Sequence, residues 1–354
     1  MSALSQFVGG GVPVGGAAFI ADGNTQTTSG IQTDFDNGTY LRSGAVLPLS
    51  SIPAFPVART EFGFTGINMP GSNNWISIAW NGTVFCTVGF NSAIAATSPD
   101  GITWTQRTLP ASAGWRSIAW NGTAFCAVAN GTAIAATSPD GITWTQRVLP
   151  VSTGWISIAW SGTVFCAVAD ASTIAATSPD GITWTQRVLP VSTAWRAIAW
   201  SGTVFCAVAD NSSIAATSPD GITWTQRTLP VLANWRSIAW SGTVFCTIAF
   251  NSSTAATSPD GITWTQRTVV VGASWSGIAW NGTVFCAVAS GTATAATSPD
   301  GITWIQRPLP TATGCVAVAW NGTLFCAISA SGSGISGQVV GLRTYTPNLY
   351  LRIS

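Results

Sequence analysis

The heptapeptide Ser-Pro-Asp-Gly-Ile-Thr-Trp occurs six times along this chain at a constant spacing of 40 residues. A period of this length indicates a repeat architecture, in which each repeat forms one supersecondary unit that packs on its neighbours. A chain that repeats one unit so faithfully has little room for a catalytic constellation that occurs only once. The six copies begin at Ser98, Ser138, Ser178, Ser218, Ser258 and Ser298.

One unit, residues 155–193, consists of short segments rich in strand-forming residues and separated by turn signals. Ser161-Gly162 is a two-residue hairpin turn; other units carry Asn-Gly there, a pair suited to two positive φ angles. The heptapeptide supplies a second turn, since Pro presets φ and Gly takes the left-handed position. The Leu-Pro pair at 189–190 is expected to break the ladder. The predicted strands span 155–160, 163–169, 173–177 and 183–188.

Four antiparallel strands in every 40 residues, with no helical period, are typical of a β-propeller blade. A β-solenoid is the alternative, but its coils are usually shorter and do not carry two tight hairpin turns each. The hairpin that opens each unit occurs seven times, which predicts an all-β, seven-bladed β-propeller. The Trp residues that end the first strand of these hairpins are Trp80, Trp120, Trp160, Trp200, Trp240, Trp280 and Trp320.

The last unit has this hairpin but lacks the heptapeptide turn. Phe64 stands 11 residues before Trp75, which is the spacing between the corresponding tryptophans of later units. We therefore expect residues 61–67 to form the fourth strand of the blade that residues 315–330 begin. The two chain ends would then close the ring and remove its open edge. The predicted organisation is an N-terminal segment at 1–59, the propeller at 60–338, and a C-terminal strand at 339–354 that packs on the N-terminal segment.

The charge of the chain excludes several classes of partner. Charged residues make up 7% of the sequence and the net charge is +1, so we expect no nucleic-acid partner and no attraction to an anionic membrane. Hydrophobic residues reach 47%, yet no apolar run approaches the roughly 18 residues of a membrane span. We expect no membrane insertion. The N-terminus lacks the positive region of a secretory signal, so we predict none.

The residue types needed for most enzymes are scarce. The chain contains no His, which is the most common general acid or base, and Glu61 is its only Glu. A glycosidase needs two carboxylates at a set separation. Asp170 and Asp210 share one position in adjacent units, but nothing tunes either of them to act as an acid. We predict no enzyme activity, no catalytic residue, no cofactor and, because the Cys residues are dispersed, no metal site.

Cysteine also follows the repeat. Cys315 is the exception, because it replaces the Trp that begins the first strand of the other units. Counting back from the Asn-Gly turn at 321–322 places Cys315 opposite Ile328 and diagonal to Cys326, at about 7 Å, which is the limit for a disulfide. The sequence leaves open whether these two are bonded. The others, predicted to be small buried residues, are Cys86, Cys126, Cys166, Cys206, Cys246, Cys286 and Cys326.

The arginines of the repeats fall into two sets. One set recurs on the fourth strand and is expected to form a surface ladder that pairs with nearby turn oxygens. A second set follows the strand-one Trp in only three units, at Arg116, Arg196 and Arg236. These would line the entrance of the central channel, where Arg beside Trp suits a sugar or an acidic group. The first set is Arg107, Arg147, Arg187, Arg227, Arg267 and Arg307.

The two ends of the ring differ in sequence. The uniform end carries the Asn/Ser-Gly and heptapeptide turns, whereas the varied end carries the connections between second and third strands and the links between units. Loops on a rigid scaffold hold binding residues, so we expect a ligand at the varied end, unless its variation is neutral drift. Exposed Phe90 and Phe250 would stack on sugar rings. The predicted ligand residues are Phe90, Asn91, Asn130, Asp170, Asp210, Asn211, Phe250 and Asn251, with Arg116, Arg196 and Arg236.

The heptapeptide resembles the Asp-box of bacterial neuraminidase repeats, Ser-x-Asp-x-Gly-x-Thr-Trp, with one residue fewer between Asp and Gly. The resemblance covers about residues 61–340 and implies a propeller, but little about activity. It implies that each Asp accepts backbone hydrogen bonds within its own turn, and that each Trp from Trp104 to Trp304 packs between neighbouring blades. The Asp residues concerned are Asp100, Asp140, Asp180, Asp220, Asp260 and Asp300.

The segments outside the repeats resemble proteins of bacteriophage tails. Residues 35–48 are similar to leader segments of tail-fibre and tail-associated proteins, and residues 348–354 to their short closing strands. The resemblance implies a virion tail protein that is extracellular when it meets the host, with residues 1–59 bound to other virion tail proteins. Residues 40–42 and 350–353 are expected to pair as strands in that docking segment.

Together these observations predict a phage tail adhesin that recognises a host-surface glycan or protein receptor without catalysis. Its oligomeric state is open: tail fibres are often trimers, but the sequence has no coiled-coil heptad that would predict a homotrimer. Three alternatives remain. They are a purely structural tail or decoration protein, a lectin-like propeller, and a polysaccharide hydrolase.

Overall fold

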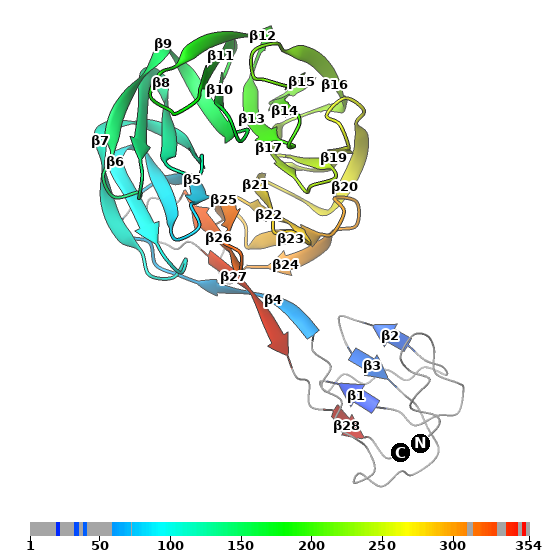
Figure 1. Cartoon of the computed structure of the whole chain (residues 1–354). Helices are drawn as coiled ribbons and strands as arrows, with labels where there is room; N and C mark the ends of the chain where they lie inside the picture. The colour runs from blue at the N-terminus through cyan, green and yellow to red at the C-terminus, as the bar shows by residue number, and fades with distance from the viewer. Residues whose placement is uncertain are drawn as a thin grey trace. The chain divides into compact units, whose positions relative to one another are not determined.

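Every regular element that the computed structural model describes is a β-strand, as the alternation of strand-forming and turn residues predicts. The described residues are 19–21, 32–34, 38–40, 59–71, 73–309, 314–330, 338–345 and 349–351. Consecutive strands pair antiparallel into sheets that stand around a common centre (Figure 1). The all-β class and the β-propeller architecture are therefore confirmed.

The unit that begins at Trp195 shows how one blade is built. Its four strands follow the sequence order across the sheet. Gly202 and Gly221, in the two turns of the uniform end, have φ of +94° and +74°, which explains why these positions are glycine. The strands are β13 (Trp195–Trp200), β14 (Phe205–Ala209), β15 (Ser212–Ser218) and β16 (Thr225–Ala233).

The fourth strand of the blade differs from the prediction. In the unit at 155–193 it starts at Thr185 rather than Thr183 and continues to Thr193, past Pro190. Pairing with the third strand is interrupted between Val188 and Thr193 and then resumes. The proline thus interrupts the ladder without ending the strand, because its missing N–H faces a gap in the pairing.

The first three units share one continuous sheet, because several strands run from one unit or hairpin into the next. Their strands are β5 (Trp75–Trp80), β6 (Phe85–Ser98), β7 (Thr105–Trp120), β8 (Phe125–Ser138), β9 (Thr145–Trp160), β10 (Phe165–Ala169), β11 (Ser172–Ser178) and β12 (Thr185–Thr193). Two further blades are β17 (Trp235–Trp240), β18 (Phe245–Ala249), β19 (Ser252–Ser258) and β20 (Thr265–Ala273), and β21 (Trp275–Trp280), β22 (Phe285–Ala289), β23 (Thr294–Ser298) and β24 (Ile305–Pro308).

The closing sheet joins the two ends of the chain, as predicted. Its order is β25-β26-β27-β4, so a strand from before the repeats completes the last blade. Strand β25 contacts both β21 and β5, which closes the circle of innermost strands (Figure 1). The count of seven blades stays a prediction from the sequence repeats. The strands of this sheet are β4 (Arg59–Gly66), β25 (Cys315–Trp320), β26 (Leu324–Ser329) and β27 (Gln338–Tyr345).

The chain divides into two compact units, residues 62–341 and residues 1–61 with 342–354. In the second unit β1 (Phe19–Ala21) pairs with β28 (Leu349–Leu351), and β2 (Gln32–Asp34) pairs with β3 (Gly38–Tyr40). The predicted pairing of residues 40–42 with 350–353 is therefore wrong: Tyr350 lies opposite Ile20, and Tyr40 lies opposite Gln32. Most of the predicted docking segment 1–59 lies outside the described residues.

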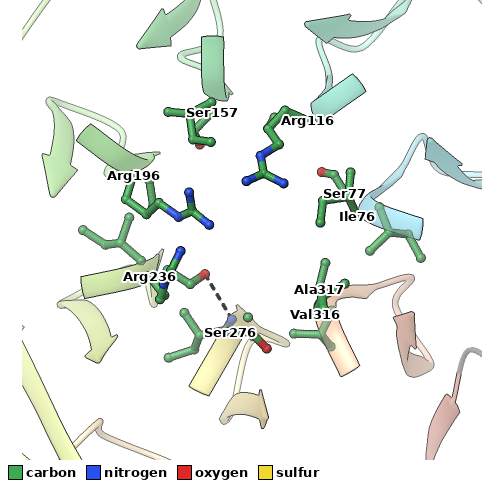
Figure 2. Close-up of a pocket in the computed structure, with 18 of the residues that line it drawn as sticks. Ile76, Ser77, Arg116, Ser157, Arg196, Arg236, Ser276, Val316 and Ala317 are labelled. Carbon is green, nitrogen blue, oxygen red and sulfur yellow. Dashed lines mark hydrogen bonds between the residues drawn. The ribbon is translucent and has the colours of Figure 1, made fainter. Parts of the chain in front are cut away.

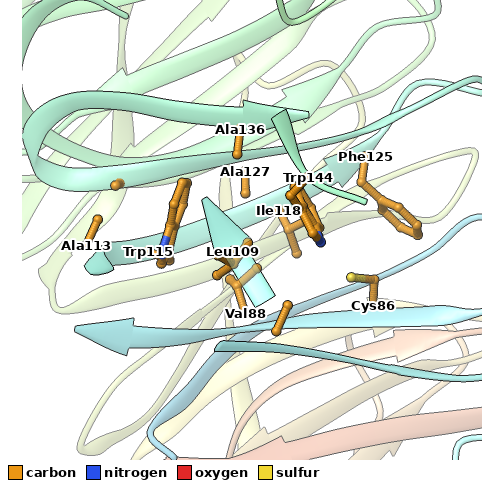
Figure 3. Close-up of a cluster of buried hydrophobic side chains, with 12 residues drawn as sticks. Cys86, Val88, Leu109, Ala113, Trp115, Ile118, Phe125, Ala127, Ala136 and Trp144 are labelled. Atoms are coloured by element: carbon orange, nitrogen blue, oxygen red, sulfur yellow. The ribbon is translucent and has the colours of Figure 1, made fainter. Parts of the chain in front are cut away.

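Buried tryptophans fill the space between neighbouring blades (Figure 3). Trp144, at the end of a heptapeptide, packs in one cluster with Phe125 of its own unit and with Cys86 and Val88 of the preceding unit. Its indole N–H donates to the carbonyl of Gly141 at 3.0 Å, so the buried ring leaves no donor unpaired. The predicted position of the heptapeptide tryptophans between blades is confirmed.

The cysteines lie in these interblade clusters. Cys86 and Cys126 belong to two separate clusters and are fully buried, and burial raises the pKa of both thiols. The predicted register of Cys315 is wrong, because a β-bulge between Cys315 and Ala317 places it opposite Ser329 rather than Ile328. Cys326 is a free thiol, so no disulfide joins it to Cys315.

The heptapeptide turns carry the predicted hydrogen bonds. Asp100 Oδ1 accepts from the amides of Ile102 at 2.8 Å and Thr103 at 2.7 Å, and from the Ser98 hydroxyl at 3.0 Å. Burial opposes ionisation, but these hydrogen bonds outweigh it and hold the pKa of the Asp100 carboxyl below its ordinary value. The same pattern recurs in the other five turns, so these aspartates act locally, on the backbone.

Candidate functional site

A cavity of about 460 Å³ opens at the centre of the ring. It is lined mainly by the second, third and fourth residues of the innermost strands, which begin at the varied end. Phe250 and Ser290, from connections between second and third strands, complete the lining. A volume of this size falls within the range of about 300–1,000 Å³ that is usual for small-molecule sites.

Three arginines face this cavity from strands β7, β13 and β17. Arg116 and Arg196 extend into the opening and Arg236 stands beside Arg196, while Ile76, Val316 and Ala317 lie across from this pair (Figure 2). The lining therefore has a cationic side and an apolar side. The predicted place of the three arginines at the channel entrance agrees with this geometry.

The described acidic residues near the site only partly balance these cations. Arg236 Nη1 lies 3.5 Å from Asp210 Oδ2, and this is the one ion pair among the described residues. The Nε atom of Arg236 is buried without a hydrogen-bond partner, although most buried donors are satisfied. Arg116 and Arg196 form no ion pair with a described carboxylate. The cavity lining itself contains no acidic residue.

The electrostatic environment of the arginines is unfavourable. Burial lowers the pKa of Arg196 to about 10, and the positive charges of Arg236 and Arg116 add to the effect against the opposing pull of Asp210 and Asp170. Burial and the charge of Arg236 also lower the pKa of Arg116. Both groups stay cationic near pH 7, so the site holds repelling, partly dehydrated charges that an anion would stabilise.

The two phenylalanines of the varied end are not exposed stacking platforms. Phe90 and Phe250 are both half-buried. The guanidinium carbon of Arg116 lies 4.9 Å from the ring centre of Phe90, and that of Arg236 lies 4.7 Å from the ring centre of Phe250. The prediction of exposed rings is wrong, because cation–π contacts already cover one face of each ring. Phe250 still contributes to the cavity wall.

The asparagines of the varied end have a structural role that the sequence analysis missed. Asn91, Asn211 and Asn251 have φ of +53°, +45° and +52°, in the left-handed region that Asn tolerates better than most residues. Ala171 has φ of +50° at the same position. The varied end is thus constrained by its own turns. These three asparagines are exposed, whereas the predicted ligand residues Asn130, Asp170 and Asp210 are half-buried, and none of the six lines the cavity.

Serines of the innermost strands join neighbouring blades at the cavity wall. Ser77 Oγ accepts a hydrogen bond from the amide of Ile118 at 3.2 Å, and Ser157 Oγ accepts one from the amide of Ile198 at 3.3 Å. Ser117 and Ser237 accept equivalent bonds. These serines were not predicted, although they recur at 40-residue spacing in the sequence.

Among the described residues, no group of three or more His, Cys, Asp or Glu is placed to hold a metal ion. No described helix is long and apolar enough to span a bilayer.

Comparison with known proteins identifies the fold. No protein-family model and no curated protein matches the sequence. The structure is similar to virginiamycin B lyase from Staphylococcus aureus (11% identity, TM-score 0.71, covering 80% of this chain and 100% of that one) and to YCF48 bound to a D1 peptide (17%, TM-score 0.65, 81% and 99%). It is also similar to the Cps50 (Swd1) β-propeller domain of Myceliophteria thermophila (13%, TM-score 0.59, 79% and 100%). Similarity at this level of identity establishes the propeller fold alone.

Proposed function

We propose that this protein is a non-enzymatic adhesin of a phage tail, which recognises a host-surface glycan with the varied end of its propeller. The observation that carries the proposal is the cavity of about 460 Å³ at that end, where three arginines meet an apolar wall. Apolar walls with a few convergent polar groups are typical of sites that bind small molecules or sugar units.

The absence of catalysis is part of this proposal. The lyases that share the fold are enzymes, and a histidine-to-alanine variant of virginiamycin B lyase, solved with quinupristin, is catalytically inactive. The chain described here has no His at all. Its cavity lining has no acidic residue either, which leaves no pair of groups suited to general acid and base roles.

The virion assignment rests on sequence resemblance. Residues 35–48 and 348–354 resemble segments of phage tail proteins, and residues 1–59 would bind the neighbouring tail proteins. The protein would then be located in the virion tail and would act outside the host cell. The oligomeric state is open, and mass measurement on the purified protein tests whether it is a homotrimer.

Binding of fluorescently labelled full-length protein to a glycan array and to a panel of bacterial cells tests the proposal. We expect binding to at least one glycan class, and Phe250→Ala, at the cavity, to weaken it at least about fivefold, the effect of losing an interface contact worth about 1 kcal/mol. Ile222→Ala changes an exposed residue of the uniform end and serves as the matched control.

Three results would contradict the proposal. The absence of binding to every glycan and cell type would favour a purely structural tail protein. Equal losses of binding for Phe250→Ala and Ile222→Ala would show that the varied end does not take part in recognition. Release of reducing ends from a bound polysaccharide would identify a hydrolase.

A further inference from the structure

The three cavity arginines are not required by the propeller itself. They occupy the second position of the innermost strand, where other units have Ile76, Ile156, Ser276 or Val316. Each blade therefore forms with an apolar or small residue at this position. Because burial and mutual repulsion penalise the cations, their presence calls for a reason other than folding.

A ligand of opposite charge supplies that reason. The guanidinium groups of Arg116 and Arg196 project into the cavity without a described ion-pair partner (Figure 2). Arg236 is held by Asp210 at 3.5 Å and by the ring of Phe250, yet its buried Nε still lacks an acceptor. Guanidinium groups match carboxylate and phosphate oxygens through paired, charge-assisted hydrogen bonds.

The opposite wall restricts the rest of the ligand. Ile76, Val316 and Ala317 present apolar surface across the opening from Arg196 and Arg236. A pyranose ring has an apolar C–H face as well as hydroxyl groups, so an acidic sugar can place its anionic group on the arginines and this face on the apolar wall. An inorganic anion alone would leave the apolar wall uncovered.

We propose that the cavity binds an acidic saccharide, whose carboxylate or phosphate group lies between Arg116 and Arg196, with Arg236 as a third cation fixed by Asp210. The proposal deepens the adhesin function and rests on it for the saccharide as target class. The anion site itself follows from the geometry of the described residues. Carboxylate and phosphate sugars share this chemistry, and the experiment below separates them.

Calorimetric titration of the full-length protein with galacturonic acid, galactose 6-phosphate and galactose tests the anion site. We expect one or both acidic sugars to bind at least about tenfold more tightly than neutral galactose, as a charged hydrogen-bonded pair provides. Tighter binding of galacturonic acid assigns the site to carboxylates, and tighter binding of galactose 6-phosphate assigns it to phosphates.

The repeat offers matched variants for this titration. Arg196→Ile copies the residue that other units carry at this position, so it preserves the blade, and it should weaken binding of the acidic sugar at least about tenfold. Arg196→Lys keeps the charge but loses the paired geometry and should retain part of the affinity. Arg147→Gln removes a positive charge from an outer strand and should change affinity less than about twofold.

Binding of neither acidic sugar, equal binding of galactose, or unchanged affinity in a folded Arg196→Ile variant would each overturn the anion site. Circular dichroism and melting temperature establish that the variant is folded. If the protein binds cells or arrayed glycans while both acidic sugars fail to bind, the inference fails and the adhesin function stands. If an acidic sugar binds but no cell or arrayed glycan does, the anion site stands and the adhesin function fails.

Discussion

The arginines of the outer strands and those of the cavity show two uses of one residue type within one repeat. Arg107 on an outer strand donates from Nε to Thr97 Oγ1 at 2.9 Å, and the same bond recurs in all six heptapeptide units. The predicted acceptor was a turn oxygen; the observed one is a hydroxyl of the adjacent strand. In contrast, Arg196 lies at a position that is Ile, Ser or Val in other units, and it has no such partner. The arginines at repeated positions make hydrogen bonds within their own blade. The arginines that depart from the repeat gather in one cavity, where their charges are not fully paired.

The largest effect is expected at a repeated position where two blades meet. At Gly221 φ is +74°, and an added Cβ would lie 2.9 Å from Thr177 Cγ2 of the preceding unit. Gly221→Ala should lower the free energy of unfolding by about 2–4 kcal/mol, through positive-φ strain together with overpacking. Gly202→Ala isolates the strain, because φ is +94° but no atom lies within 4 Å, and should cost only about 1–2 kcal/mol. Equal losses in urea denaturation would show that the blades do not interlock at this glycine.

Substitutions in the two sets of arginines should change the stability of the protein in opposite directions. Arg147→Gln removes the donor to Thr137 and should destabilise the protein by about 1 kcal/mol. Arg196→Ile removes a partly dehydrated, repelled charge and should stabilise the protein by about 1 kcal/mol. Chemical denaturation at pH 7 and low salt measures both. A destabilised Arg196→Ile variant would mean that the cavity arginine stabilises the fold, as the outer-strand arginines do.

A smaller effect concerns the pH dependence of the heptapeptide turns. Hydrogen bonds lower the pKa of Asp180 below its ordinary value of 3.8 despite the opposing effect of burial. A carboxyl whose pKa falls on folding stabilises the protein fully above its unfolded pKa, and this contribution is lost as the pH falls through the folded-state pKa. Asp180→Asn should therefore lower the free energy of unfolding by about 0.5–1 kcal/mol at pH 7, a range that already allows for solvent screening. The loss should be smaller below pH 3.8. Melting curves from pH 7 to pH 2 would contradict this if the two proteins differed by a constant amount.

Most of the propeller could be predicted because its determinants are local or strictly periodic. Turn signals and strand formers at 40-residue spacing indicate the blades, and the spacing of Phe64 from Trp75 indicates the closing strand. The register of Cys315 could not be predicted, because the bulge beside it changes the count by one residue. The same bulge recurs in the first strand of the other units, so it is a feature of the folded blade that the strand-forming residues around it do not signal.

The site was predicted in part, because some of its residues are visible in the sequence as departures from the repeat. Arg116, Arg196 and Arg236 stood out because they interrupt a repeated position, and they line the cavity. The role of Asn211 was missed because a positive φ is a property of the folded turn. The serine bonds were missed because Ser157 and Ile198 are 41 residues apart, so their contact depends on how adjacent blades pack.

The most direct test of the account is the affinity of a protein whose cavity has been made regular. The triple variant Arg116→Ile, Arg196→Ile and Arg236→Ile gives these units the residue of Ile76 and Ile156, while Arg147→Gln, Arg187→Gln and Arg227→Gln remove equal charge from outer strands. Titration of both with the tightest acidic sugar should show that the first variant loses at least about 100-fold in affinity and the second less than about threefold. Unchanged affinity in the first variant, or an equal loss in both, would contradict the claim that departures from the repeat form the binding site.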